Sequence, residues 1–299
     1  MADLPSSIIG IQDEDEHVNI LVYADSGVGK TVFAGSDDDV LFVAPEDNGT
    51  LSAKRFGSTA KKWKIHGWDD IVAAYDWLYS LDVIPFNWVV LDSLTEMQDM
   101  CMRKVLDEAL EINPSRDPDL PLIGDWQPYY NRFQRLVKAF GSLPVNILYT
   151  ALQMEEEDEE GEKVVLPMLQ GKGTQYSKKI CGFMTSFGNM RVVRKQVGAE
   201  DGEKKFEEYR RIQWRASKSV MAKDRTRCLE PVTIIGEGKL GGLKDIRELL
   251  EAGPPQPAAG RVPPRKTSGG LKIQESEDDD EQPKQQRVSL VSANSGEDE

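Results

Sequence analysis

The sequence predicts an α/β fold with a mostly parallel sheet flanked by helices, followed by an antiparallel hairpin that extends the sheet. Along the first 151 residues, short runs rich in Val, Ile and Leu alternate with longer amphipathic stretches. Strands without polar alternation are typical of a parallel sheet that helices cover on both faces. Further on, two extended segments at 183–195 and 206–217 are joined by the turn-rich sequence GAEDGEK, which favours a hairpin.

The spacing of apolar residues assigns each element in order. The acidic run at 155–162 is expected to be a solvated loop tip. Apolar residues at helical spacing predict helices, and short apolar runs bounded by turn residues predict strands. The expected strands are 17–24, 40–44, 87–92 and 145–151, and the expected helices are 30–36, 50–57, 69–81, 94–112, 126–142 and 174–181.

Composition divides the chain into an N-terminal extension at 1–16, one domain at 17–251 and a tail at 252–299. The tail holds 11 prolines and glycines among 48 residues, together with a block of acidic residues. Such a segment buries too little apolar surface to offset the entropy of ordering, so we expect it to be disordered. It is expected to keep the protein soluble; the alternatives are that its acidic residues mimic nucleic acid or recruit a protein partner.

The overall composition narrows the class of protein. No apolar run approaches the roughly 20 residues needed to span a bilayer, and the acidic N-terminus lacks the features of a signal peptide. We therefore expect a cytoplasmic protein without a membrane partner. Three cysteines and two histidines without a CxxC spacing fit neither a disulfide framework nor a common zinc site.

Charge is unevenly distributed along the chain, whose formal net charge is -14. Residues 171–227 hold 15 lysines and arginines against 6 aspartates and glutamates, whereas residues 1–170 hold 13 against 31. A local basic stripe can bind phosphates despite an acidic total if it lies on one face. The alternative is that these side chains form solvated faces of the hairpin.

The segment ADSGVGKT at 24–31 lies between the first strand and the first helix. Glycines let consecutive backbone N–H groups turn toward a phosphate, a lysine reaches the β and γ phosphates, and a hydroxyl binds Mg²⁺. Ala24 stands where the usual pattern has glycine. The alternative is a glycine-rich turn with no ligand. The expected nucleotide-binding residues are Asp25, Ser26, Gly27, Val28, Gly29, Lys30 and Thr31.

The run NWVVLD ends at Asp92, about 60 residues after Lys30. A carboxylate at the carboxyl end of a buried parallel strand can hold Mg²⁺ together with the hydroxyl of Thr31. We therefore assign Asp92 to a Walker B strand and predict a magnesium site at Thr31 and Asp92.

The second strand ends in the sequence APED, which contains Glu46. A carboxylate at this edge can orient and deprotonate the attacking water, so Glu46 is the predicted general base. The alternative is an exposed acidic turn before Asn48 and Gly49.

The strand at 145–151 contains Thr150 near its end, and Gln153 follows it. One of them is expected to sense the γ-phosphate and couple it to the loop beginning at Met154, and the sequence does not decide which. Gln153 is counted among the nucleotide-binding residues. The alternative is a strand end that leads into a polar loop.

A late basic segment, MAKDRTR, places Lys223 and Arg225 two residues apart. On a strand, cations at this spacing point the same way and can reach one phosphate cluster. If they complete a neighbouring subunit's site, they neutralise charge in its transition state and count as catalytic. The alternative is a strand edge protected by charge.

The order of these motifs resembles the RecA-like ATPases, and more closely the phage-encoded RecA-like proteins of the AAA-domain, nucleotide-binding phage family associated with single-strand annealing and recombination. The resemblance covers about residues 17–250 through ADSGVGKT, FVAPED, WVVLDSLTE, ILYTALQ, PMLQGKG and MAKDR. It implies Mg²⁺-dependent ATP hydrolysis in a RecA core, with protomers in a ring or filament. Lys30 and Thr31 would grip phosphate and metal, and Asp92 would support the metal. Glu46 would activate water, and Lys223 and Arg225 would reach the adjacent nucleotide.

The resemblance also implies single-stranded DNA as a partner, with a DNA-binding loop at 154–175. That segment is acidic at 155–162, so the hairpin is the alternative contact. Without a long N-terminal helix or a folded C-terminal domain, annealing or loading is expected rather than strand exchange. Two other hypotheses for the function remain, a nucleotide kinase and an ATP-gated assembly factor that does not act on DNA. The candidate DNA contacts are Lys172, Lys178 and Lys179 after the loop, and Arg191, Arg194, Arg210 and Arg211 on the hairpin.

Overall fold

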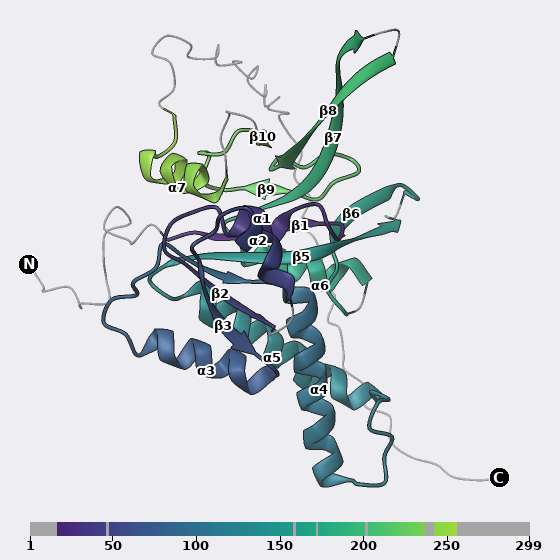
Figure 1. Cartoon of the computed structure of the whole chain (residues 1–299). Helices are drawn as coiled ribbons and strands as arrows, with labels where there is room; N and C mark the ends of the chain where they lie inside the picture. Colours follow the sequence, from purple (N-terminus) through teal and green to yellow (C-terminus); the bar gives the residue numbers. More distant parts are fainter. Residues whose placement is uncertain are drawn as a thin grey trace, which may run out of the picture. The chain divides into compact units, whose positions relative to one another are not determined.

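The computed structural model describes residues 17–45, 48–157, 160–171, 173–200, 203–236 and 242–255 (Figure 1). The predicted general base Glu46 lies outside these residues, and so do Lys172, the N-terminal extension and most of the predicted tail. The division into three parts therefore stays a prediction. No helix among the described residues is long and apolar enough to cross a membrane.

One mixed sheet of ten strands forms the centre of the described chain, in the order β10-β8-β7-β1-β5-β4-β2-β3, with β6 and β9 paired off this path. Its middle is parallel, which confirms the predicted fold class. Helices bury both faces of the central parallel strands, and this explains why β2 and β4 are apolar throughout. The parallel strands are β1 (Asn19–Ala24), β2 (Val40–Pro45), β3 (Lys61–Ile65), β4 (Trp88–Leu91) and β5 (Asn146–Glu157).

The predicted hairpin is formed by β7 (Ser186–Glu200) and β8 (Glu203–Gln213). The first residues of β7 pair in parallel with β1, and the rest of the strand pairs antiparallel with β8 (Figure 1). The two-residue strand β9 (Lys223–Asp224) pairs with β7, and β10 (Val232–Ile235) pairs with β8. The hairpin therefore begins inside the core sheet.

Helices cover both faces of the sheet, and each face has its own apolar cluster. Burial of each large aliphatic side chain contributes about 1.5–3 kcal/mol, so these clusters dominate the stability of the layers. The larger cluster packs under α3 (Trp68–Tyr79), α4 (Leu94–Ile112), α5 (Ile123–Gly141) and α6 (Gly173–Gly182), and the smaller one under α1 (Lys30–Ala34) and α7 (Leu243–Ala252). A short turn η2 (Asn48–Thr50) and helix α2 (Leu51–Arg55) lie beside α1.

Helix α7 is held to the core by a buried ion pair. Arg247 donates to both carboxylate oxygens of Asp37, at 2.7 and 3.1 Å, and Trp88 Nε1 donates to the same carboxylate at 3.0 Å. The side chain of Asp37 is fully buried. A buried carboxylate with three such donors joins helix, loop and strand at one point.

Several features differ from the expectation, including β10, α7, β3 and the extent of β5. The edge strand β3 was not predicted, because its sequence KKWKI contains three lysines and no apolar run. Charged residues are typical of an edge strand. In addition, β5 continues to Glu157, because Glu155–Glu157 pair with β6 (Lys163–Pro167). The acidic run therefore begins in a strand, and the prediction of a loop over all of 155–162 is wrong.

Candidate nucleotide-binding site

The loop between β1 and α1 has the backbone shape that its glycines predict. Gly27 and Gly29 adopt φ values of 76° and 113°, in the left-handed region that favours glycine. Gly29 is also the N-cap of α1, so the positive end of the helix faces the loop. The arrangement is that of a phosphate-binding loop, or P-loop.

Lys30 lies across this loop and is 8% exposed. Its ammonium donates to the carbonyls of Ala24 at 3.1 Å and Asp25 at 2.9 Å. Burial lowers the pKa of Lys30, while the carboxylates of Asp92 and Asp25 oppose that shift. The cation is thus held against the loop backbone and poorly solvated, which strengthens its attraction to a bound phosphate.

Asp92 follows β4 and joins the P-loop to the neighbouring strand. Thr31 Oγ1 donates to Asp92 Oδ2 at 2.7 Å, and Thr150 Oγ1 donates to Asp92 Oδ1 at 2.5 Å. The peptide bond between Asp92 and Ser93 is cis. A hydroxyl and a carboxylate side by side are hard oxygen donors of the kind that Mg²⁺ prefers, so Thr31 and Asp92 fit the predicted metal.

Gln153 also reaches the P-loop. Its Nε2 donates to Asp25 Oδ2 at 2.9 Å, and its Oε1 accepts from Asn189 Nδ2 at 2.9 Å. Arg191 Nε in turn donates to Asn189 Oδ1 at 2.5 Å. Thr150 and Gln153 therefore both contact the site, Thr150 at the Walker B carboxylate and Gln153 at the loop.

Asn189 was missed by the sequence reasoning. It is 1% exposed and lies in the apolar run of β7 next to β1, where it also donates to the carbonyl of Tyr23 at 3.2 Å. A polar amide in an otherwise apolar strand is the signal that could have found it, because such a group is buried only with partners.

A cavity of about 660 Å³ opens over the P-loop. It is continuous in its lining with a smaller cavity of about 160 Å³, since Thr31, Gly49, Asp92, Ser93 and Glu96 line both. The larger cavity has the size of a small-molecule site. Its lining combines predicted residues (Ser26, Gly27, Gly29, Lys30, Thr31, Asp92) with residues that the sequence did not assign to a nucleotide (Phe56, Glu96, Leu152, Arg210, Ile235).

Arg210 is the cation of this lining that comes from the hairpin. Its Nε donates to the carbonyl of Val28 in the P-loop at 2.7 Å, across 182 residues of sequence. The sequence placed Arg210 among candidate DNA contacts. In the structure it lines the nucleotide cavity, and its contact with DNA stays a prediction.

Lys223 and Arg225 lie elsewhere. Strand β9 pairs with Ser186 and Phe187, which are level with Ile20 and Leu21 near the start of β1, whereas the P-loop follows the end of β1. The two cations therefore do not contact the P-loop of their own chain.

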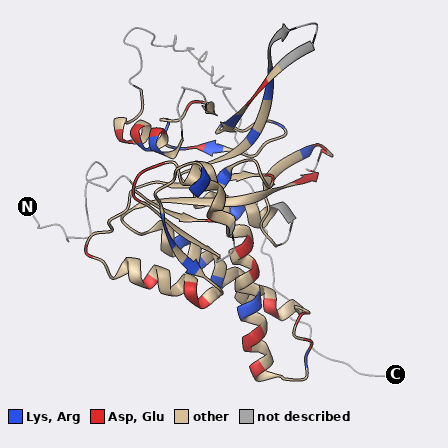
Figure 2. Cartoon of the chain, viewed as in Figure 1, with Lys and Arg blue, Asp and Glu red and all other residues tan. Residues whose placement is uncertain are grey.

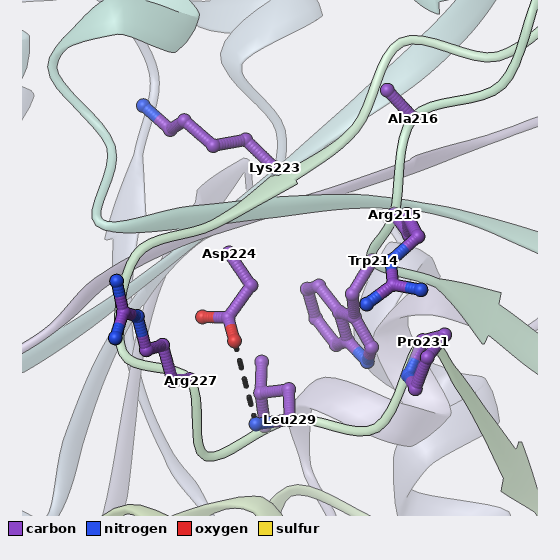
Figure 3. Close-up of a pocket in the computed structure, with 8 residues that line it drawn as sticks. All are labelled: Trp214, Arg215, Ala216, Lys223, Asp224, Arg227, Leu229 and Pro231. Carbon is purple, nitrogen blue, oxygen red and sulfur yellow. Dashed lines mark hydrogen bonds between the residues drawn. The ribbon is translucent and has the colours of Figure 1, made fainter. Parts of the chain in front are cut away.

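Both cations of this pair turn toward the end of α6. Lys223 Nζ donates to the carbonyl of Cys181 at 3.2 Å and lies 5.3 Å from the centre of the Phe187 ring, and Arg225 donates to the carbonyl of Gly182 at 3.5 Å. Burial and the nearby Arg225 lower the pKa of Lys223. In Figure 3 Lys223 points away from the other lining residues of a separate cavity of about 370 Å³. Arg225 is exposed.

Lysine and arginine residues mark the hairpin and β9 (Figure 2). Arg194 pairs with Glu208 at 2.7 Å on the exposed arm of the hairpin, whereas Arg191 turns inward to Asn189. Lys178 and Lys179 are exposed on α6. The arginines predicted to contact DNA thus lie in two places, Arg194 on the exposed arm of the hairpin and Arg191 and Arg210 near the P-loop.

The geometry defines a P-loop nucleotide-binding protein, and comparison with known families agrees with it. Residues 16–226 match the AAA domain family, which is more than half of the chain. The chain belongs to this family of AAA domains, and it is an AAA-type P-loop ATPase domain. No curated protein matches the sequence.

Similar solved structures are distant. They include a prototypical ATPase from the type III secretion system of pathogenic bacteria (14% identity, covering 58% of this chain and 52% of that one, TM-score 0.35) and the RadB recombinase (13% identity, 69% and 90%, TM-score 0.32). A third is the flagellar accessory protein FlaH from Methanocaldococcus jannaschii (9% identity, 65% and 77%, TM-score 0.29). The family assignment rests on the domain match and not on these likenesses.

Proposed function

We propose that this AAA domain protein is a Mg²⁺-dependent ATP hydrolase of RecA-like type that acts on single-stranded DNA in phage recombination, annealing or loading. The observation that carries the ATPase part is the Thr31–Asp92 contact at 2.7 Å beside Lys30. Thr31, Asp92 and Lys30 line one cavity, which supports their proposed roles in holding Mg²⁺ and phosphate.

Each residue has a separate task in this proposal. The backbone of Gly27–Lys30 and the ammonium of Lys30 hold the phosphates, and Thr31 and Asp92 hold Mg²⁺, which neutralises phosphate charge when it is bound. Thr150 fixes the orientation of Asp92 through its hydrogen bond. Glu46 remains the proposed base that takes a proton from the attacking water.

The DNA part is supported by the path from the hairpin to the P-loop. Strand β7 reaches Asp25 through Asn189 and Gln153, and β8 reaches Val28 through Arg210. Single-stranded DNA bound along the basic hairpin can therefore alter the conformation of the P-loop. The exposed cations of the arm supply the electrostatic attraction that single strands require.

The placement of Arg225 supports the proposal of self-association. Because it is exposed and lies at the end of the sheet away from its own P-loop, we propose that it serves the site of the next protomer in a ring or filament. Such a cation supplied in trans stabilises the charge that develops during phosphoryl transfer. The acidic tail is the proposed site for a further protein partner.

The test is ATP hydrolysis with Mg²⁺, with and without single-stranded DNA, at two salt concentrations, with Lys30→Ala as the blank. We expect DNA to stimulate hydrolysis and salt to weaken the effect. The logarithm of the DNA binding constant should fall with the logarithm of the salt concentration, with a slope of about -0.7 per phosphate contacted. Hydrolysis that is indifferent to DNA would leave the ATPase and remove the DNA part, in favour of a kinase or an assembly factor. Hydrolysis that survives Lys30→Ala would show that this P-loop is not the ATPase site, and would contradict the proposed ATPase function and its stimulation by DNA.

A further inference from the structure

The row of side chains on one face of β8 leads to the nucleotide cavity. Alternate residues of a strand share a face, so Arg210, Ile212 and Trp214 point the same way. Ile212 and Trp214 are buried in the smaller apolar cluster, which also contains Phe33 of α1. Arg210 continues this row past the apolar part, and therefore reaches the start of α1 and the P-loop.

The P-loop is shaped to admit this arginine. A Cβ atom added at Gly29 would lie 3.0 Å from Arg210 Nε and 3.4 Å from Arg210 Cδ. A separation of 3.0 Å is shorter than ordinary van der Waals contact, so a side chain at position 29 would require Arg210 to shift. The glycine at position 29 thus satisfies the backbone φ of 113° and also leaves room for Arg210.

Only one nitrogen of the guanidinium is used within the described chain. Nε donates to the carbonyl of Val28, and the two Nη atoms have no hydrogen-bond or ion-pair partner among the described residues. Arg210 itself is exposed at the mouth of the cavity. The guanidinium is therefore anchored on its Nε side, and its remaining donors are available to a ligand.

Charge in the cavity calls for a second cation. Lys30 and Arg210 are the cations of its lining, and Asp92 and Glu96 are the carboxylates. A nucleoside triphosphate brings several negative charges, which one ammonium and one metal ion neutralise in part. A guanidinium offers paired donors that match phosphate oxygens, and charge-assisted bonds of this type are about twice as strong as neutral ones.

We propose that Arg210 binds the phosphates of the nucleotide held by its own chain, as a cation supplied in cis by the hairpin. This inference rests on the proposed ATPase function and names a further phosphate-binding residue for it. It also gives the hairpin a direct contact with the ligand. Movement of β8 then changes phosphate binding without passing through Gln153.

The first test measures binding of ATP and ADP with Mg²⁺ by titration calorimetry to the full chain. Arg210→Ala is expected to weaken both by about 10- to 100-fold, the range for hydrogen bonds to charged groups. Arg210→Lys keeps the charge and should recover most of the loss. Arg210→Gln keeps a donor for Val28 but no charge, and should not recover it.

Arg103→Ala is the matched control, because it removes an exposed arginine on α4 that does not line the cavity, and its binding of ATP and ADP should equal that of the parent. Recovery by Arg210→Gln and not by Arg210→Lys would show that Arg210 only props the loop, and would overturn the proposal. Equal binding by Arg210→Ala and the parent would overturn it as well. Failure of the underlying ATPase function is distinguishable, because Lys30→Ala would then also bind like the parent.

The second test separates cis from trans action by mixing variants. Arg210→Ala mixed with Lys30→Ala should show no recovery of hydrolysis, because an arginine acting in cis cannot serve the intact P-loop of another chain. Recovery in this mixture would overturn the cis assignment.

Discussion

The hydroxyl of Thr150 donates a hydrogen bond to Asp92, from the strand that lies between the P-loop strand and the Walker B strand. Thr31 donates to the other oxygen of the same carboxylate. Both oxygens are therefore held by hydroxyl groups, and the carboxylate has a fixed orientation before any metal binds. A ligand fixed by its own hydrogen bonds binds metal more tightly than a free one.

Replacing Thr150 tests this orientation. Thr150→Val has nearly the same shape but donates no hydrogen bond, and we expect hydrolysis to require about 10-fold more Mg²⁺, in line with the loss of one support of a metal ligand. Thr150→Ser keeps the hydroxyl and should behave like the parent. The Mg²⁺ concentration at half-maximal rate is the measurement, and an unchanged value for Thr150→Val would show that Thr150 does not orient Asp92.

The lowered pKa of Lys30 predicts a pH dependence of ATP binding. Burial favours the neutral amine in the free protein, whereas a bound triphosphate favours the ammonium. Binding therefore takes up a proton at high pH, and the affinity for ATP should fall as pH rises through the lowered pKa. Calorimetry at high pH in two buffers of different ionisation heat measures the uptake, and Lys30→Ala should lack it.

The general base can be identified by comparing two carboxylates. Glu46 is the residue predicted from the sequence, and Glu96 lines both cavities beside Asp92. Glu46→Gln should retain ATP binding and slow hydrolysis by about 100-fold or more, the usual contribution of a general base. Glu96→Gln should change the rate far less. The reverse ranking in single-turnover hydrolysis would move the base to Glu96.

A contribution from a neighbouring protomer predicts complementation. Arg225→Ala should hydrolyse ATP about 1,000-fold more slowly than the parent, the lower end of what such a cation contributes. Mixing it with Lys30→Ala should restore part of the activity, because each variant supplies what the other lacks. Absence of recovery at protein concentrations where the parent assembles would assign Arg225 a structural role.

The buried pair of Arg247 and Asp37 predicts where the folded domain ends. Arg247→Ala leaves the fully buried carboxylate of Asp37 without its cation and should lower the free energy of unfolding by about 3 kcal/mol.

Deletion of 256–299 should leave the thermal transition and the basal hydrolysis unchanged, since it retains α7. Denaturant unfolding of both proteins against the parent measures the difference, and a large loss in the truncated chain would place part of the fold in the tail.

The parallel strands and long helices followed from local pattern, and α4 begins and ends at the residues expected from its spacing. Strand β10 and helix α7 were not anticipated, because their stability comes from pairing with β8 and from contacts with Asp37 rather than from a long apolar repeat. Local sequence predicts an element poorly when distant partners supply its stability.

The P-loop, Thr31 and Asp92 could be found because each carries its chemistry in a short motif. The path from Asp25 through Gln153 to Asn189 could not, because its successive residues are 128 and 36 positions apart and meet only in the folded sheet. For the same reason Arg210 looked like one of several hairpin arginines until the pairing of β7 and β8 fixed its direction.

Strand β7 runs without interruption from its pairing with β1 to a register shift between Gln196 and Gly198. A β-bulge bends a strand and increases its local twist, so the direction of β7 changes at this point, which lies outside the lining of the nucleotide cavity. A ligand bound to the part of the hairpin before the bulge would lie on the strands that reach Asp25 and Val28. A ligand bound beyond the bulge would be separated from them by this bend.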